Sequence, residues 1–251
     1  MTFPLALGGA VLVGVSLGLL GAGGSILTVP IFLYLVGMPA KLAMSASLLV
    51  VLLASAVAAL LHQREGNVKF SVAIPFALGG LPAAFYGGRF AKSLPDEVLT
   101  LAFALFMVLA AFALHRRSVE PAQITQRTFV STVLCGAIVG LVTGTLGAGG
   151  GFLIVPALAV SPGLPMRQAV GTSLVIITAN AAMALVARSQ EGIFADGIAL
   201  VFAAIAGVGA FVGHHYSQRF PQRTLRRVFS VFVLLIAAYM AVGSLRSLYV
   251  L

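Results

Sequence analysis

Charged residues are scarce in this sequence. Of its 251 residues only 8% are charged, whereas 60% are hydrophobic, and the mean hydropathy is +1.10. A soluble domain carries about 25% charged residues, so this composition excludes an ordinary soluble protein. The apolar residues form runs of about twenty, each long enough to cross a hydrocarbon core roughly 30 Å thick. Because backbone groups in lipid must bond internally, we expect these runs to be helices.

Several features that would carry enzyme chemistry are missing. Cys135 is the only cysteine, which excludes an intrachain disulfide and a cysteine-based metal site. There is no phosphate-binding loop and no H-E-x-x-H pair, so neither an ATP-driven pump nor an intramembrane zinc enzyme is indicated. All six acidic residues lie in expected loops, which disfavours a proton relay through buried carboxylates. We therefore expect no cofactor, no metal and no catalytic residues.

The net charge of +9 does not indicate a nucleic-acid partner. The basic residues lie in short loops between the apolar runs, a distribution that membrane topology explains better. A positive chain with few acidic residues also suits anions better than cations. The expected partners are the lipid bilayer and a small anion.

Two glycine-rich breaks interrupt the apolar runs. The first is Gly21-Ala22-Gly23-Gly24-Ser25, followed by Val29-Pro30; the second is Gly147-Ala148-Gly149-Gly150-Gly151, followed by Val155-Pro156. The offset of 126 residues between them also pairs positions elsewhere, including Pro39 with Pro165, Ser47 with Ser173, and Glu65 with Glu191. Matches at one offset along the chain predict an internal duplication.

The expected fold is an all-α polytopic membrane protein with two repeats of five helical pieces each. In the first repeat these pieces cover about 4–20, 26–36, 40–61, 70–90, and a last piece that ends near 114. The piece at 26–36 reaches only about half way across a membrane, so it is expected to form a hairpin with the piece before it. The expected units are a first transmembrane repeat at 1–114, a cytoplasmic linker at 115–127, and a second repeat at 128–251.

The basic loops favour inverted topology for the two repeats. With hairpins and an outside N-terminus, ten basic residues face the cytoplasm and five face outward; a parallel arrangement gives seven inside and eight outside. The positive-inside rule favours the first arrangement, a plan that recurs among transporters. The five outward residues are Lys41, Arg89, Lys92, Arg188 and Arg246.

The glycine breaks are the first candidate anion site. The half-helix after each break would present backbone N–H groups and the positive end of its dipole near the middle of the membrane. Close helix packing is the alternative role of glycine, and we expect it for Gly14, Gly18, Gly140 and Gly144. The candidate substrate-binding residues at the breaks are Gly21, Gly23, Gly24, Ser25, Gly147, Gly149, Gly150 and Gly151.

Small hydroxyl residues near the start of the third piece of each repeat are the second candidate. Ser45 and Ser47 correspond to Gly171 and Ser173, with Thr172 between them. Hydroxyls can donate to an anion without a buried charge, or can bond back to their own helix. Asn180 is either a ligand contact or an interhelical hydrogen bond. The histidines, at or near span ends, are expected to be solvated: His62, His115, His214 and His215.

The combined motifs resemble the TauE/SafE family of sulfite-exporter-like permeases. The resemblance lies in the paired G-x-G-G-[SG] breaks with V-P five residues on, the P-x-[KR]-x-A turn into S/T-S-L, and the E-G loop. It covers essentially the whole chain. It implies transport of a small sulfur-containing anion, such as sulfite, thiosulfate or an organosulfonate, across the bacterial inner membrane.

We therefore expect a multi-pass secondary permease that works by alternating access. An anion channel or uniporter could use the same helix-end chemistry without coupling. A membrane scaffold whose glycines only pack helices is a third, less favoured interpretation.

Overall fold

The described part of the chain is entirely helical apart from its connections. No strand occurs in the residues that the computed structural model describes. These residues are 3–20, 23–116, 128–147, 154, 158, 164–189, 197–216, 234 and 236.

Seven long helices account for most of the described residues, and three short pieces follow the first of them. The expected helix positions are confirmed in this part, although α3 and α4 each extend three residues further than expected. The elements are α1 (Phe3–Leu20), η1 (Gly23–Leu27), α2 (Thr28–Pro30), η2 (Ile31–Val36), α3 (Ala40–Arg64), α4 (Phe70–Ser93), α5 (Asp96–Arg116), α6 (Phe129–Leu146), α8 (Met166–Ala187) and α9 (Gly197–Tyr216).

The segment after the first glycine break folds back along α1. A Cβ atom added at Gly24 would lie 2.6 Å from the backbone nitrogen of Leu17, and Gly9 packs against Ile31 near the other end of the segment. The segment is therefore antiparallel to α1. Its winding changes from 3-10 to α to π, so it is an irregular half-helix, as is common where a helix is interrupted at a functional place.

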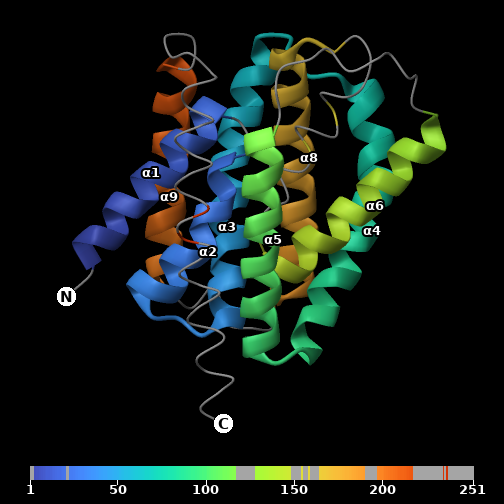
Figure 1. Cartoon of the computed structure of the whole chain (residues 1–251). Helices are drawn as coiled ribbons and strands as arrows, with labels where there is room; N and C mark the ends of the chain where they lie inside the picture. Colours follow the sequence, from blue (N-terminus) through green and yellow to red (C-terminus); the bar gives the residue numbers. More distant parts are fainter. Residues whose placement is uncertain are drawn as a thin grey trace.

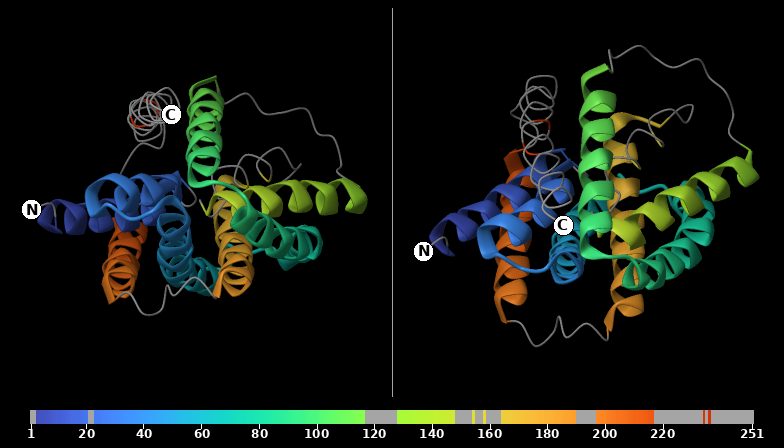
Figure 2. Two further views of the ribbon diagram at one scale, coloured as in Figure 1. Left: turned by 90° about the horizontal axis from the view of Figure 1, so that it is seen from below. Right: turned by 60° about the horizontal axis from the view of Figure 1, so that its bottom comes forward.

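Four of the seven long helices form a row, and two others, α1 and α6, lie across it. Seen from below in Figure 2, α9, α3, α8 and α4 follow one another, while α1 and α6 extend toward opposite sides. Helix α1 packs against α9, and α6 packs against α4. The row places α3 and α8 at the centre of the molecule (Figure 1).

The central helices α3 and α8 run in opposite directions. Near one end the Arg188 guanidinium donates to the Ser45 hydroxyl over 3.2 Å. In the middle the hydroxyl oxygens of Ser55 and Thr178 are 2.9 Å apart. Near the other end, Thr172 of α8 accepts a hydrogen bond from the backbone N–H of Lys69, in the connection that follows α3. We call this α3–α8 contact the central seam.

Glycines allow the closest helix contacts. Gly14 packs directly on the backbone of Ala206, joining α1 to α9, and Gly140 packs directly on the backbone of Gly80, joining α6 to α4. In each case a side chain would overlap a backbone carbonyl of the partner helix. The packing role expected for Gly14 and Gly140 is confirmed, and Gly18 and Gly144 make equivalent contacts one turn further on.

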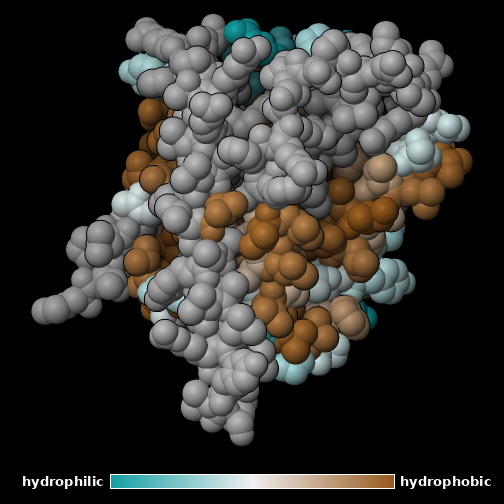
Figure 3. Space-filling view, viewed as in Figure 1, coloured by the Kyte–Doolittle hydropathy of each residue, from teal (hydrophilic) through white to brown (hydrophobic). Residues whose placement is uncertain are grey.

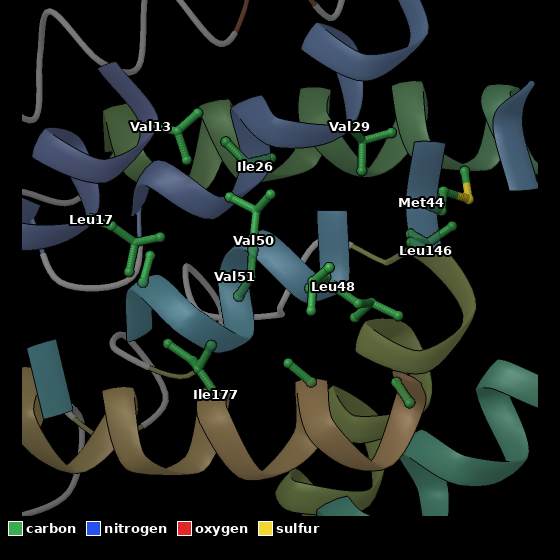
Figure 4. Close-up of a cluster of buried hydrophobic side chains, with 14 of the residues drawn as sticks. Val13, Leu17, Ile26, Val29, Met44, Leu48, Val50, Val51, Leu146 and Ile177 are labelled. Atoms are coloured by element: carbon green, nitrogen blue, oxygen red, sulfur yellow. The ribbon is translucent and has the colours of Figure 1, made fainter. Parts of the chain in front are cut away.

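The outer surface suits a hydrocarbon environment. Five of the described helices, α3, α4, α6, α8 and α9, are long and apolar enough to cross a membrane by length and composition. Large apolar side chains such as Ile138 and Val208 are about two-thirds exposed. Figure 3 shows apolar side chains gathered across the middle of one face. The interior is filled by Leu, Ile, Val, Met and Ala side chains from several helices (Figure 4).

Candidate functional site

The second glycine break begins directly against α3. Gly147 ends α6 with a φ of 69°, and its N–H bonds back to the Thr143 carbonyl. A Cβ atom at this position would lie 2.8 Å from the Cβ atom of Met44. Figure 4 shows Met44 beside Leu146, the last residue of α6. The close approach and the left-handed backbone both require glycine here, and they place Gly147, the first residue of the break, beside the Met44–Ser45 backbone.

Arg188 connects the same region to α8. The residue caps the C-terminus of α8, and its side chain is fully buried. Besides its bond to Ser45, Nη2 donates to the carbonyl oxygens of Gly144 over 2.9 Å and Thr145 over 2.7 Å. These carbonyls lie in the last turn of α6, where helical partners are missing and the helix dipole is negative. The guanidinium therefore links the ends of α6 and α8 to the start of α3.

The burial of Arg188 corrects the sequence-based placement. The residue was expected in a solvated outer loop, but it lies inside the protein between α3, α6 and α8. Sequence reasoning missed it as a site residue because an arginine at the end of an apolar run usually reaches water. The offset of 126 offers a weak signal, since it pairs Arg188 with His62, the other basic residue at the end of a central helix.

Two buried hydroxyls, one on α3 and one on α2, have no hydrogen-bond partner among the described residues. Ser47 lies three positions after Met44, on the same face of α3, and its Oγ is unbonded. Thr28, on the short helix α2, has an unbonded Oγ1. Sequence reasoning selected Ser47 but not Thr28. Because a buried polar group without a partner is costly, such groups in a native fold call for an explanation, such as a ligand or water. Ser25, which carries the hydroxyl of the first break, is fully buried.

The hydroxyls of α8 are already bonded within the protein. Thr172 Oγ1 accepts the backbone N–H of Lys69 over 3.0 Å, which ties α8 to the residue before α4. Ser173 Oγ donates to the carbonyl of Val170 in its own helix over 2.7 Å. Both side chains are buried. Ser173 thus makes the local bond that was one of its two expected roles.

Histidines lie near the same end of the central seam. The His62 and His214 rings are 4.6 Å apart in an edge-to-face arrangement, and His214 Nε2 lies 2.9 Å from Glu65 Oε1. Desolvation alone would raise the pKa of the Glu65 carboxyl, but the hydrogen bond and charge of His214 lower it overall. The expectation of a solvated His62 is wrong, because the residue is only 7% exposed between α3, α8 and α9.

Asn180 lies inside the protein on α8. It is fully buried, and neither amide atom has a hydrogen-bond partner among the described residues. A Cβ atom at Gly80 of α4 would lie 2.8 Å from Asn180 Oδ1, so the glycine leaves room for the amide. No interhelical hydrogen bond of Asn180 occurs in the described part.

The candidate residues fall into separate places. Gly147, Ser45 and Ser47 lie at one end of the central seam, whereas Thr172 and Ser173 lie at the other. Sixteen residues of α8 between Thr172 and Arg188 correspond to about 24 Å, too far for one small anion to bridge. Gly23 and Gly24 belong to the segment packed on α1. Four predicted residues lie outside the described part: Gly21, Gly149, Gly150 and Gly151.

The chemistry of these groups suits an anion. Around the start of α3 the structure gathers two serine hydroxyls and a permanently charged guanidinium, which donate hydrogen bonds or carry positive charge. In the part of the chain that the structure describes, no group of three His, Cys, Asp or Glu side chains could hold a metal ion. A helical membrane bundle with buried donors of this kind is the arrangement expected of a polytopic transport protein.

Comparison with known proteins identifies the family. The family model described as "Sulfite exporter TauE/SafE" matches residues 6–240. A "Probable membrane transporter protein" of Xylella fastidiosa is 32% identical, with 97% of each chain covered. YdhB of Bacillus subtilis, also named a probable membrane transporter protein, is 29% identical over 86% of this chain and 90% of its own. No solved structure matches the chain.

The chain belongs to the TauE/SafE family of sulfite-exporter-like membrane transport proteins. It is a multi-pass membrane protein, and the relatives above are named probable membrane transporter proteins.

Proposed function

We propose that this protein is a secondary permease for a small sulfur-containing anion, such as sulfite, thiosulfate or an organosulfonate, in the bacterial inner membrane. The main supporting observation is the buried Ser47 hydroxyl, which has no hydrogen-bond partner among the described residues and lies one turn from the contact between Met44 and Gly147, where the second glycine break begins. Such a hydroxyl can donate to an anion that the break admits. The family description supports the sulfur chemistry.

The proposed architecture is a pair of inverted repeats, 1–114 and 128–251, joined by a cytoplasmic linker at 115–127. Two observations support it. The contact of Gly14 with Ala206 and that of Gly140 with Gly80 are related by the 126-residue offset, with the two halves exchanged. The corresponding helices α3 and α8 are antiparallel, as an axis in the membrane plane requires (Figure 1).

In this architecture each end of the central seam is a separate half-site. Ser45, Ser47, Gly147 and the following glycines would contact the anion at one end. Residues Thr172 and Ser173, with the first break, would contact it at the other. Asn180 lies between these ends on α8. Alternating access would open one end while the other is closed.

The site is tested by replacing Ser47 with alanine. Because Ser47 Oγ has no partner to lose among the described residues, the ligand-free protein should keep its thermal stability. Loss of a hydrogen bond to a charged ligand should weaken anion binding by about 10- to 100-fold. Binding of sulfite, thiosulfate and an alkanesulfonate to the purified protein measures the effect. Ser55→Ala is the matched control, since that buried hydroxyl of α3 is bonded to Thr178.

Transport by the same variants separates the possible functions. Counterflow in proteoliposomes should show trans-stimulation for an alternating carrier, whereas an open channel shows none. Unchanged anion affinity in Ser47→Ala would refute the site, and no binding by the natural protein would refute the function and leave the scaffold interpretation.

A further inference from the structure

Arg188 is the largest fully buried side chain in the described part of the protein. Three of its contacts are hydrogen bonds to neutral oxygen atoms, the Ser45 hydroxyl and the carbonyls of Gly144 and Thr145. The carbonyls stand two and three residues before the second glycine break, within the last turn of α6. The guanidinium thus lies where two elements of the proposed anion site, Ser45 and the break, come together.

The charge matters because of the direction of α6. The C-terminal end of a helix carries partial negative charge, which repels an anion. An anion that approaches the second break also approaches this end of α6. Arg188 donates to the Gly144 and Thr145 carbonyls, so a permanent positive charge lies beside them. This full charge outweighs the partial negative charge of the helix end and makes the electrostatic potential there favourable for an anion.

We infer that Arg188 binds the oxyanion directly at this end of the central seam. A guanidinium presents parallel N–H donors that match two oxygens of a sulfite or sulfonate group, and a charged acceptor binds it more strongly than a neutral carbonyl or hydroxyl does. The anion exchanges with the bonds to Gly144 and Thr145, while Ser45 remains beside the guanidinium as a second donor. This role rests on the proposed permease function. It gives the proposed anion site a charged residue that determines specificity.

The exchange also connects binding to the break. In the ligand-free arrangement Arg188 holds the last turn of α6 against α3 and α8. When the anion takes over the guanidinium, that turn loses two hydrogen bonds next to Gly147. The last turn of α6 can then move, and its movement would open this end of the central seam in the proposed mechanism.

Helix α4 and the last turn of α8 hold the backbone from which this side chain extends. Ala187, the residue before Arg188, lies against Gly88 of α4, where an added Cβ atom would come within 2.9 Å of the alanine Cβ atom. The backbone N–H of Arg188 is bonded to the carbonyls of Ala184 and Leu185 over 3.1 Å. The backbone that carries the guanidinium is therefore held by α8 and α4 independently of the guanidinium's own acceptors, as the support of a binding group must be.

The test compares Arg188→Met, which removes the charge, with Arg188→Lys, which keeps the charge but loses the paired donors. Arg167→Met is the matched control, because Arg167 is an exposed arginine in the first turn of the same helix. Thermal unfolding of the purified variants is measured without ligand and with sulfite, thiosulfate and an alkanesulfonate. This separates the stability of the fold from the stabilisation by the anion.

Both Arg188 variants should unfold at lower temperature without ligand, because the last turn of α6 loses hydrogen bonds. Arg188→Met should lose the anion-induced shift, with binding weakened at least 100-fold, and Arg188→Lys should bind about 10- to 100-fold more weakly. Arg167→Met should bind like the natural protein.

Each outcome decides the assignment. A folded Arg188→Met protein that keeps its anion-induced shift would show a purely structural role and overturn the inference, leaving the permease function intact. If Arg188→Met does not fold, an Arg188→Lys protein that binds the anion as tightly as the natural protein overturns the inference in the same way. If the natural protein binds none of the three anions, the permease function fails and the inference fails with it.

Discussion

Replacing Asn180 with leucine changes a buried amide into an apolar side chain of similar size, and the sign of the stability change identifies the role of the amide. Neither amide atom has a hydrogen-bond partner among the described residues. An unsatisfied buried polar group costs about 1–3 kcal/mol, and the amide contributes both a donor and an acceptor. Asn180→Leu should therefore stabilise the ligand-free protein by about 2 kcal/mol or more.

An interhelical hydrogen bond would give the opposite sign. Such bonds in membrane helices contribute about 0.6 kcal/mol on average and up to about 1.7 kcal/mol, so Asn180→Leu would then be destabilising. At this chain length 1 kcal/mol corresponds to about 2–4 °C in the unfolding midpoint. We therefore expect the midpoint to rise by about 4–8 °C in detergent. A fall would refute the assignment of Asn180 as an unbonded group.

Gly80 supplies a second, independent test of the same contact. A methyl group at this position would come within 2.8 Å of Asn180 Oδ1, so Gly80→Ala should force the amide to move and should destabilise the protein. The smaller side chain of Asn180→Ala leaves space for that methyl group. The double variant should therefore be more stable than the sum of the two single changes predicts. Additive effects would show that the two residues do not contact each other.

The second break and the central seam give two further predictions. Gly147→Ala should destabilise the protein by about 2 kcal/mol or more, because its φ is 69° and its new methyl group meets Met44. Gly37→Ala is the control: its φ is 79° but a methyl group there meets open space, so it should cost only about 1 kcal/mol in the same thermal assay. Equal costs would contradict the contact between Gly147 and Met44. Cysteines at Ser55 and Thr178, in a background without the natural cysteine, should form a disulfide across the central seam that stops transport until it is reduced, with the single-cysteine variants as controls; full transport by the oxidised protein would refute movement at the seam.

Much of the fold was predictable because the membrane restricts the choices of the chain. An apolar run of about twenty residues must satisfy its own backbone, so the helices could be located from the sequence. The small-residue spacing at Gly14 and Gly140 correctly predicted close helix contacts. The serines of α3 were selected for their hydroxyls at a helix start inside the membrane; both are buried, and they lie within one turn of Met44, which contacts Gly147.

The partners of these elements were not predictable, because they depend on contacts between distant parts of the chain. Nothing in the local pattern shows that α1 packs against α9 and α6 against α4. For the same reason Arg188 and His62 were assigned to solvated ends, although helices distant in the sequence bury them. The spacing of hydroxyls likewise gave no information on distance, and Ser47 and Ser173 lie at opposite ends of the central seam.

The glycine contacts restrict which parts of the protein can move in the proposed mechanism. Because Gly14 joins α1 to α9, and Gly140 joins α6 to α4, each tight pair combines a helix of the first half with a helix of the second. The two sequence halves therefore cannot rotate against each other as rigid bodies without breaking these direct backbone contacts. Helix α3 packs on both α9 and α8, and α8 also packs on α4. The α3–α8 contact, the central seam, differs from the glycine contacts because side-chain hydroxyls meet there, Ser45 with Arg188 and Ser55 with Thr178, and no glycine in the described part of either helix is pressed on the backbone of the other. The proposed alternating access therefore needs movement at the central seam rather than between the two sequence halves.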